Sequence, residues 1–302
     1  MIFLASLMLI CLSCKDEDDS LARSGLIECI QKAETSISES VEGNEEGCIA
    51  PGSKDILQTR IDWAYFILQN SSSDEAYTNA LKILDDAIAA FYANTVKAGV
   101  PLFGLGSKMN LGPVGDWNVT ESFSIECRGE YYEFSGGDQN VFFCESGNSG
   151  WMLRSSGNVI QFYINDGNWT GCQTSSLELN RWYHVAATYQ KGGGIALYLD
   201  GKKVGSSSCG TLQVTPNADL QAGTAPSYSD RYMRGYIQDL SLWKDVRTAE
   251  EVAADINCDF SGTEDGLNAY WPLNLNLGTS ITDKTGNHTV NLVDVVWENP
   301  EE

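Results

Sequence analysis

Short runs in which apolar and polar residues alternate are the feature that most constrains the fold of this chain. They follow one another from about residue 100 to the end of the 302 residues. Over residues 159–165, for example, Ile and Phe alternate with Gln, Tyr and Asn, and this period of two is typical of strands with one buried face. Asp200-Gly201 is a tight-turn signal between two such runs. Many short strands joined by turns predict an all-β sandwich.

The segment before residue 100 has the spacing of helices instead. Its apolar residues recur three and four apart in two runs, which comprise Ile56, Leu57, Ile61, Ala64, Ile67 and Leu68, then Ala76, Ala80, Ile83, Leu84, Ala87, Ile88 and Phe91. Polar residues 70–73 separate the runs, so we expect an antiparallel helical hairpin. A weaker helix over 21–37 would complete a small α-helical bundle. We expect residues 21–98 to serve as a spacer before the sandwich.

The first thirteen residues are uncharged and largely apolar. This run is too short to span a bilayer and is typical of an export signal. Residues 10–14 (ICLSC) resemble the bacterial lipobox, and the resemblance implies that Cys14 carries a lipid anchor. The acidic tether over 14–20, which contains KDEDD, resembles the surface-export signal of some lipoproteins. We therefore expect a lipoprotein anchored in the outer membrane and displayed at the cell surface.

The formal net charge of −22 restricts the partners of the chain. Nucleic acids and anionic membrane surfaces attract basic proteins, so we expect no nucleic-acid partner. The acidity also keeps an exposed protein soluble.

Seven segments of the C-terminal part occur in the order that characterises a known domain. In chain order they are 121–125 (ESFSI), 179–189 (LNRWYHVAATY), 197–202 (LYLDGK), 235–243 (GYIQDLSLW), 248–252 (TAEEV), 269–273 (AYWPL) and 283–287 (DKTGN). Together they resemble the concanavalin A-like, laminin G-like jelly roll over residues 103–298. The resemblance implies a jelly-roll sandwich in which Trp182, Trp243 and Trp271 belong to the core. Lectins, adhesion modules and glycosidases share this fold, so it does not fix the function.

Aromatic rings that stack on sugars, beside planar polar groups, are typical of a carbohydrate site. Strand parity predicts one polar sheet face that carries Arg128, Glu130, Tyr132, Gln161, Tyr163 and Asn165. Loop residues Trp151, Trp169, Tyr228 and Tyr232, with Arg231, are expected at its rim. From this set the candidate carbohydrate-binding residues are Arg128, Glu130, Tyr163, Asn165, Trp169, Tyr228, Arg231 and Tyr232. The expected partner is an extracellular glycan.

A catalytic role would need a pair of carboxyl groups around a glycosidic bond. Glycosidases of this fold carry Glu, Asp and Glu at alternate positions of one strand. Here Glu126, Arg128 and Glu130 have that parity, but a cation replaces the Asp, so we interpret the set as a charge ladder. His184 is expected to be structural, and His288 falls in a terminal turn. We expect a non-catalytic protein for carbohydrate binding or adhesion; a glycoside hydrolase and a protein-binding adhesin are the alternatives.

Some laminin G-like domains bind calcium through Asp residues. Gln238 stands where the family often has Asp, and Asp239 follows it. This departure argues against a calcium site, so we expect no cofactor. An exported protein meets oxidising conditions, and we expect the disulfides Cys172–Cys209 and Cys127–Cys144, with Cys258 unpaired.

Overall fold

The computed structural model describes residues 20–134, 138–146 and 149–299. The chain divides into two compact units, Met1–Thr95 and Val96–Glu302. The first is helical and the second is a sandwich of antiparallel strands, which confirms the predicted fold class. Cys14 and the acidic tether lie outside the described residues, apart from Ser20.

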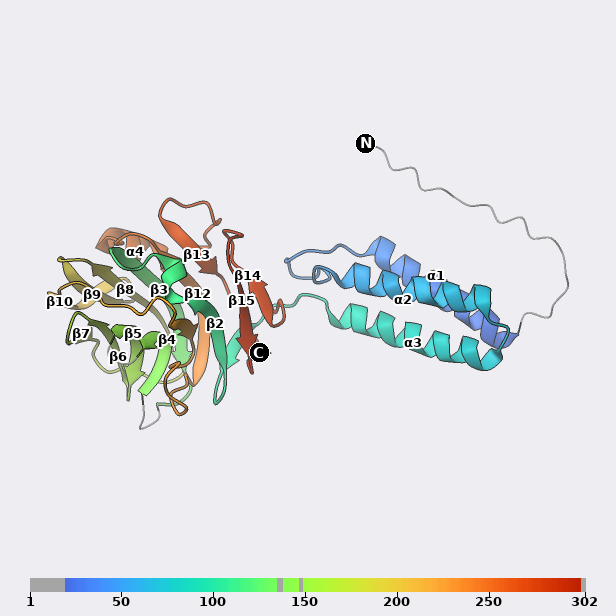
Figure 1. The fold of residues 1–302 in the computed structure, drawn as a ribbon, viewed down its shortest axis with the longest axis horizontal. Helices are drawn as coiled ribbons and strands as arrows, with labels where there is room; N and C mark the ends of the chain where they lie inside the picture. The colour runs from blue at the N-terminus through green and yellow to red at the C-terminus, as the bar shows by residue number, and fades with distance from the viewer. Residues whose placement is uncertain (1–19, 135–137, 147–148, 300–302) are drawn as a thin grey trace. The chain divides into compact units, whose positions relative to one another are not determined.

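The helical unit contains the three expected helices, α1 (Leu21–Glu39), α2 (Ser53–Asn70) and α3 (Asp74–Ala93) (Figure 1). Ser20 and Ser73 cap α1 and α3, because each side chain accepts a hydrogen bond from a backbone N–H of the first turn. The three helices bury one shared core, which includes Leu26, Ile30, Leu57, Ile61, Leu84 and Ile88. Among the described residues, no helix has the length and apolar character needed to cross a bilayer.

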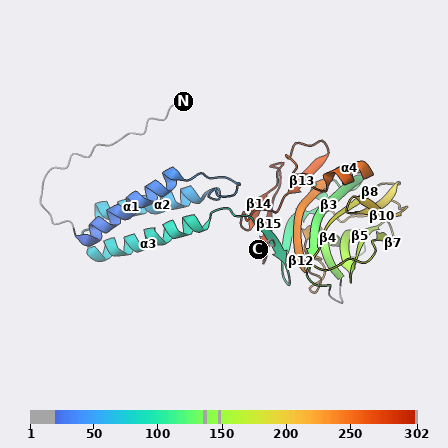
Figure 2. The ribbon, with the colours of Figure 1, turned by 180° about the vertical axis from the view of Figure 1, so that it is seen from behind.

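The second unit consists of two eight-stranded antiparallel sheets (Figures 1 and 2). The first sheet has the order β10-β9-β8-β3-β12-β1-β16, with β13 beside β12, and the second has the order β14-β15-β2-β11-β4-β5-β6-β7. The strands of the first sheet are β1 (Val100–Phe103), β3 (Ser122–Tyr131), β8 (Trp182–Gln190), β9 (Gly194–Leu199), β10 (Lys202–Ser207), β12 (Gly235–Trp243), β13 (Leu267–Trp271) and β16 (Val296–Glu298).

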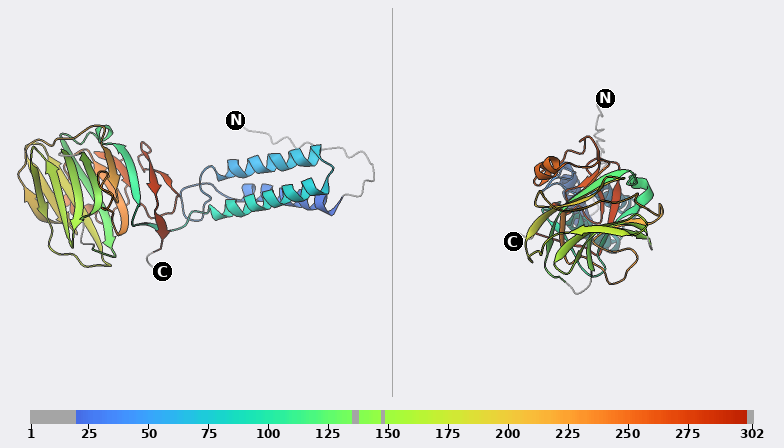
Figure 3. Two further views of the ribbon diagram at one scale, coloured as in Figure 1. Left: turned by 60° about the horizontal axis from the view of Figure 1, so that its bottom comes forward. Right: turned by 90° about the vertical axis from the view of Figure 1, so that its left-hand side faces the viewer.

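The second sheet and two short helices complete the sandwich. The strands of the second sheet are β2 (Lys108–Pro113), β4 (Asp138–Ser146), β5 (Ser149–Ser156), β6 (Val159–Asn165), β7 (Trp169–Gln173), β11 (Asp219–Ala222), β14 (Ser280–Thr282) and β15 (Thr289–Val293). A 3-10 helix, η1 (Val114–Trp117), and a short helix, α4 (Ala249–Asp255), lie between strands in the chain. Figure 3 shows the strands from two further directions.

The core lies between the sheets and is rich in aromatic rings. Phe123 of β3 packs on Trp151 of β5 at 4.7 Å between ring centroids, and Phe142 of β4 packs on the same Trp151 at 5.0 Å. The prediction that Trp151 rims a polar face is therefore wrong. The pairing of β5 with β6 sets Trp151 opposite Ile164, and both side chains are fully buried.

The three tryptophans that were expected in the core lie in different surroundings. Trp271 is 1% exposed and belongs to the core between the sheets, as expected. Trp243 is also 1% exposed, but it packs with Phe260 and Tyr270 in a separate cluster outside that core. Trp182 is only half-buried, because it alternates with the core residues Tyr183 and Val185 of β8. The prediction that Trp182 belongs to the core is wrong: its ring lies on the outer face of the first sheet.

Two local structures in the sandwich follow directly from the residues that form them. Asp200 and Gly201 both have positive φ, 49° and 73°, as a type I′ turn between β9 and β10 requires. The side chain of Thr248 accepts a hydrogen bond from Glu251 N, and the Glu251 side chain accepts one from Thr248 N. This capping box starts α4.

The two predicted disulfides are not formed. Cys127 and Cys144 belong to facing sheets, and such sheets stand about 10 Å apart, beyond the usual Cα separation of a disulfide. Cys172 faces Gly205, where an added Cβ would come within 3.1 Å of the Cys172 Cβ. Cys209 lies beyond the end of β10, and neither thiol forms a disulfide.

Candidate functional site

The predicted polar face is divided between two sheets. Arg128 and Glu130 lie on β3 of the first sheet, whereas Tyr163 lies on β6 of the second. Ile125 of β3 and Phe162 of β6 both point into the core between the sheets, so the alternate residues point outward on opposite sides of the sandwich. The prediction of one shared face is therefore wrong.

An open groove of about 420 Å³ lies on the outer face of the second sheet. It combines aromatic rings, two guanidinium groups and one carboxylate. The residues that line it are Asp138, Met152, Arg154, Tyr163, Trp169, Tyr228 and Arg231. Strands β4, β5, β6 and β7 supply the first five, and the segment after β11 supplies Tyr228 and Arg231.

The floor of the groove is built by cross-strand packing. Met152 pairs with Tyr163 in the register of β5 and β6, and it is buried against Ala225, with Tyr163 and Trp169 beside it. The Tyr163 ring lies over Gly171 of β7, where an added Cβ would stand 2.2 Å from two ring carbons. The missing side chain at position 171 is therefore what allows the ring to lie against the sheet.

Charged groups occupy one side of the groove. Arg154 donates a hydrogen bond to Asp138 Oδ2, and Arg231 Nη1 is 3.4 Å from the same oxygen. Arg154 Nε also donates to Gln161 Oε1 at 3.2 Å. The guanidinium of Arg231 stacks on Tyr228 with its carbon 3.6 Å from the ring centroid. These contacts hold both cations at the groove instead of leaving them free in solvent.

The structure brings together four of the eight predicted carbohydrate-binding residues, namely Tyr163, Trp169, Tyr228 and Arg231. Asn165 is buried and accepts a hydrogen bond from Gly167 N, so its side chain supports the β6–β7 turn. Tyr232 forms a backbone bridge with Thr224 and does not line the groove.

The sequence interpretation missed Asp138, Met152 and Arg154. Met152 and Arg154 alternate with the buried Trp151 and Leu153, so a period-two reading of β5 could have assigned them to an outer face. No local signal connects Asp138 to that face, whereas Arg231 was expected there with Tyr228. The position of Asp138 depends on the pairing of β4 with β5.

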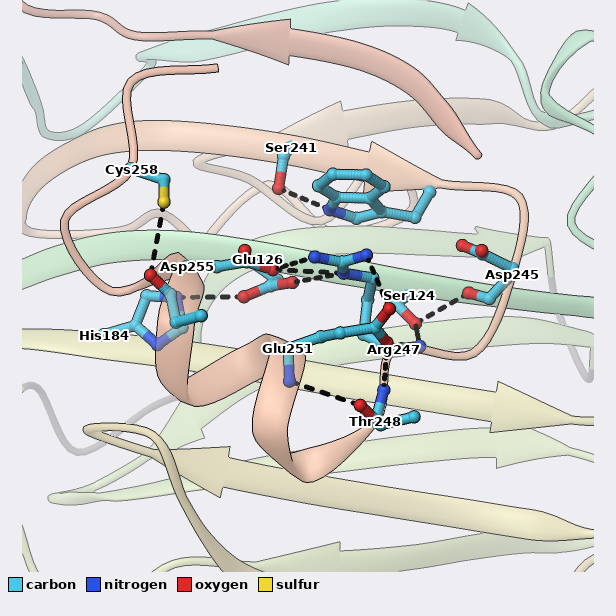
Figure 4. A network of polar contacts seen from close by, with 12 residues as sticks. Ser124, Glu126, His184, Ser241, Asp245, Arg247, Thr248, Glu251, Asp255 and Cys258 are labelled. Carbon is cyan, nitrogen blue, oxygen red and sulfur yellow. Dashed lines mark hydrogen bonds and ion pairs between the residues drawn. The ribbon is translucent and has the colours of Figure 1, made fainter. Parts of the chain in front are cut away.

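The first sheet carries a covered polar cluster rather than an open site (Figure 4). Glu126 of β3 is 2% exposed, and its Oε2 is 3.0 Å from His184 Nε2 of β8. Arg247 lies between the sheet and α4: its Nη2 is 2.6 Å from Asp255, and its Nε is 3.8 Å from Glu126. Burial raises the pKa of Glu126, although the neighbouring His184 opposes the shift.

This cluster corrects the charge-ladder interpretation. Glu126, Arg128 and Glu130 do share the outer face of β3, but Glu126 pairs with His184 and Arg247. Arg128 pairs instead with Asp239, at 3.7 Å, and its guanidinium lies 5.3 Å from the Trp182 ring centroid. Because Glu126 is covered, it is not accessible to a polysaccharide.

The position suggested for calcium is also engaged by side chains. Asp239 accepts a hydrogen bond from the Tyr270 hydroxyl at 3.0 Å and pairs with Arg128. Burial raises the pKa of Asp239, which disfavours its charged form. Within the described residues, no group of three His, Cys, Asp or Glu side chains is placed to hold a metal ion.

The helical unit has a hollow of its own, of about 520 Å³, between α2 and α3. Half of its lining residues are aliphatic, with Ile56, Leu57 and Ile83 among them, and Phe91 is the aromatic residue. This surface offers apolar contact but lacks the several aromatic rings and paired guanidinium groups of the sandwich groove.

Comparison with protein families identifies the sandwich. Residues 103–253, half of the chain, match the family described as the concanavalin A-like lectin/glucanases superfamily. The chain therefore belongs to this superfamily. No curated protein matches the chain.

Two solved structures are similar to this chain at low sequence identity. A candidate carbohydrate-binding protein from Bacteroides ovatus ATCC 8483 is 21% identical, with a TM-score of 0.56 over 67% of this chain and 60% of that one. The chain thus spans less than two thirds of that protein. A heptameric SAP-like pentraxin from Limulus polyphemus is 15% identical, with a TM-score of 0.48 over 67% of this chain and 94% of the pentraxin. The likeness to the Bacteroides protein shows the fold alone.

Proposed function

We propose that this protein binds carbohydrate, without cleaving it, in the groove on the outer face of the second sheet. The observation that carries the proposal is the gathering of Tyr163, Trp169 and Tyr228 with polar side chains on one open face. Aromatic rings offer stacking surfaces for the apolar faces of sugars. Guanidinium and carboxylate groups offer hydrogen bonds to hydroxyls.

The carboxyl content of the groove supports binding rather than hydrolysis. Glycoside hydrolysis commonly needs two carboxyl groups around the bond, and Asp138 is the one carboxylate among the described residues that line the groove. Its Oδ2 is shared by Arg154 and Arg231. The described lining of the groove therefore lacks the second carboxyl group that this chemistry uses.

The proposal includes display at the cell surface. Cys14 would carry the lipid anchor, and the helical unit would separate the sandwich from the membrane. Palmitate labelling in the native host would test the anchor: label on the wild type and its loss in Cys14→Ala are expected. Label that persists in Cys14→Ala would contradict the anchor without affecting the binding proposal.

A glycan array tests the binding proposal with the chain from Lys15 onward. We expect a defined set of bound glycans and a loss of affinity of about 10-fold in Tyr163→Ala or Trp169→Ala, because each removes a stacking surface. Tyr132→Ala is the matched control, since Tyr132 is 41% exposed but does not line the groove. Silence across the array, or release of reducing ends from a bound glycan, would overturn the proposal.

A further inference from the structure

The groove is a local surplus of positive charge on a strongly acidic protein. Its charged lining residues are Arg154, Arg231 and Asp138, so two cations minus one anion leave a formal charge of +1. The whole chain carries −22. A neutral sugar would not require this surplus, because serine, asparagine or glutamine side chains also bind hydroxyl groups.

The two guanidinium groups retain hydrogen-bonding capacity toward a ligand. Each guanidinium has five N–H donors. Arg154 uses Nε for Gln161 and Nη1 for Asp138, so its Nη2 group makes no hydrogen bond to another of the described residues. Arg231 stacks its face on Tyr228, and stacking leaves the N–H edge of the plane available. The side chains of Arg154 and Arg231 are 19% and 24% exposed.

Both cations are held in place before a ligand arrives. Asp138 Oδ2 contacts both guanidinium groups, while Gln161 and Tyr228 fix one each. Less side-chain entropy is therefore lost on binding than with free surface arginines. A planar carboxylate matches the forked N–H donors of an arginine. Tyr163 and Trp169 line the same groove and offer stacking surfaces for the sugar ring.

We propose that the groove selects acidic glycans, with Arg231 and Arg154 binding the carboxylate of a uronic acid and the aromatic residues binding its ring. This inference rests on the proposed function and specifies its ligand class. Arg231 is the main specificity determinant, because its ion contact with Asp138, at 3.4 Å, is long. Arg154 positions Asp138 as well as facing the ligand.

The test compares uronate-containing polysaccharides with their carboxyl-reduced forms, in which each uronic acid has become the neutral sugar. Titration calorimetry with the chain from Lys15 onward should show about 10-fold tighter binding of the acidic form, weakened by added NaCl. Arg231→Gln should abolish the difference, and Arg231→Lys should retain part of it. Thermal unfolding of each variant shows whether it is folded.

Arg181→Gln is the matched control, because Arg181 also stacks on a tyrosine, Tyr183, and pairs with an aspartate, Asp200, but does so away from the groove. It should bind as the wild type does. Equal binding of acidic and reduced forms, still weakened by Tyr163→Ala, would overturn the acidic preference and leave the proposed function intact. Absence of binding to every acidic, reduced and neutral glycan would overturn both.

Discussion

Tyr163 and Gly171 show how much of the groove depends on single atoms. The tyrosine can lie against the sheet only because its cross-strand partner, Gly171, has no Cβ. Arg247 has a comparable role on the opposite face, where it contacts Glu126, Glu251 and Asp255 together. At the residue scale, Gly171 thus shapes the outer face of the second sheet, and Arg247 holds together the acids on the outer face of the first.

Gly171→Ala should weaken glycan binding while leaving the sandwich folded. The new Cβ would stand 2.2 Å from the Tyr163 ring, so the ring must leave the groove floor. Gly129→Ala on β3 is the control, because its Cβ would meet neighbours at an ordinary 3.7 Å. Calorimetry and thermal unfolding of both variants measure the outcome; unchanged affinity in Gly171→Ala would contradict the role given to Tyr163.

Arg247→Met should destabilise the sandwich by about 3 kcal/mol, because it leaves buried acids without their cation. The arginine side chain is 11% exposed. The control, Arg181→Met, removes an arginine whose side chain is 52% exposed and should cost less than about 1 kcal/mol. Urea unfolding gives both free energies, and equal costs would show that the cluster does not hold α4 to the sheet.

Cys172 should react slowly with iodoacetamide until the pH approaches 11. Burial raises the pKa of its thiol to about 11, and the thiolate is the reactive form. In the folded protein the rate should therefore rise roughly tenfold per pH unit between about 8 and 10. In urea without reductant the thiol should react readily at pH 8.5. Failure to react in urea would indicate that Cys172 forms a disulfide after all.

The short helix α4 determines which face of the sandwich is closed. Val252 packs on Ala186, Ala196 and Tyr198 of the first sheet, and Arg247 adds ionic contacts before the helix begins. The second sheet has no helix in a corresponding place among its described neighbours, and there the groove lies open. One seven-residue helix therefore accounts for the different character of the two faces.

Thr248→Ala should cost about 1 kcal/mol of stability, since it removes the side-chain cap of α4. Thr248→Ser retains the hydroxyl and should restore most of the loss. Urea unfolding measures both, while glycan affinity should remain at the wild-type value because α4 packs on the other sheet. A large loss of affinity in Thr248→Ala would mean that the closed face contributes to binding.

At the scale of elements, the sequence predicts much of the fold but less of the site. Three-and-four spacing predicted the helices, and alternation predicted β3 and β6, because these patterns follow from local geometry. Alternation cannot reveal which sheet a strand joins, since pairing depends on distant segments. For this reason Arg128 and Tyr163 were assigned to one face although they lie on opposite sides, and Asp138 was not recognised.

The whole molecule consists of two units with separate hydrophobic cores. Leu26 and Ile61 belong to the helical core, whereas Phe123 and Trp151 belong to the sandwich core. Each unit therefore has the buried apolar surface that a domain needs to fold by itself. The groove lies wholly within the second unit.

Residues 96–302 expressed alone should fold and bind glycans with the affinity of the longer chain. The prediction follows because neither the sandwich core nor the groove uses a residue before Val96. Calorimetric unfolding should give one transition for the fragment, and calorimetric titration should give an unchanged affinity. Aggregation of the fragment, or a clear loss of affinity, would show that the helical unit supports the sandwich.

The alternation of side chains along β5 and β6 separates two tasks that many binding proteins combine. Met152 and Arg154 face the groove, whereas their neighbours Trp151 and Leu153 fill the core. Substitution on the outer face therefore leaves the packing beneath it unchanged. Such a surface can be re-engineered for a new sugar, or can diverge during evolution, with little risk to the scaffold that carries it.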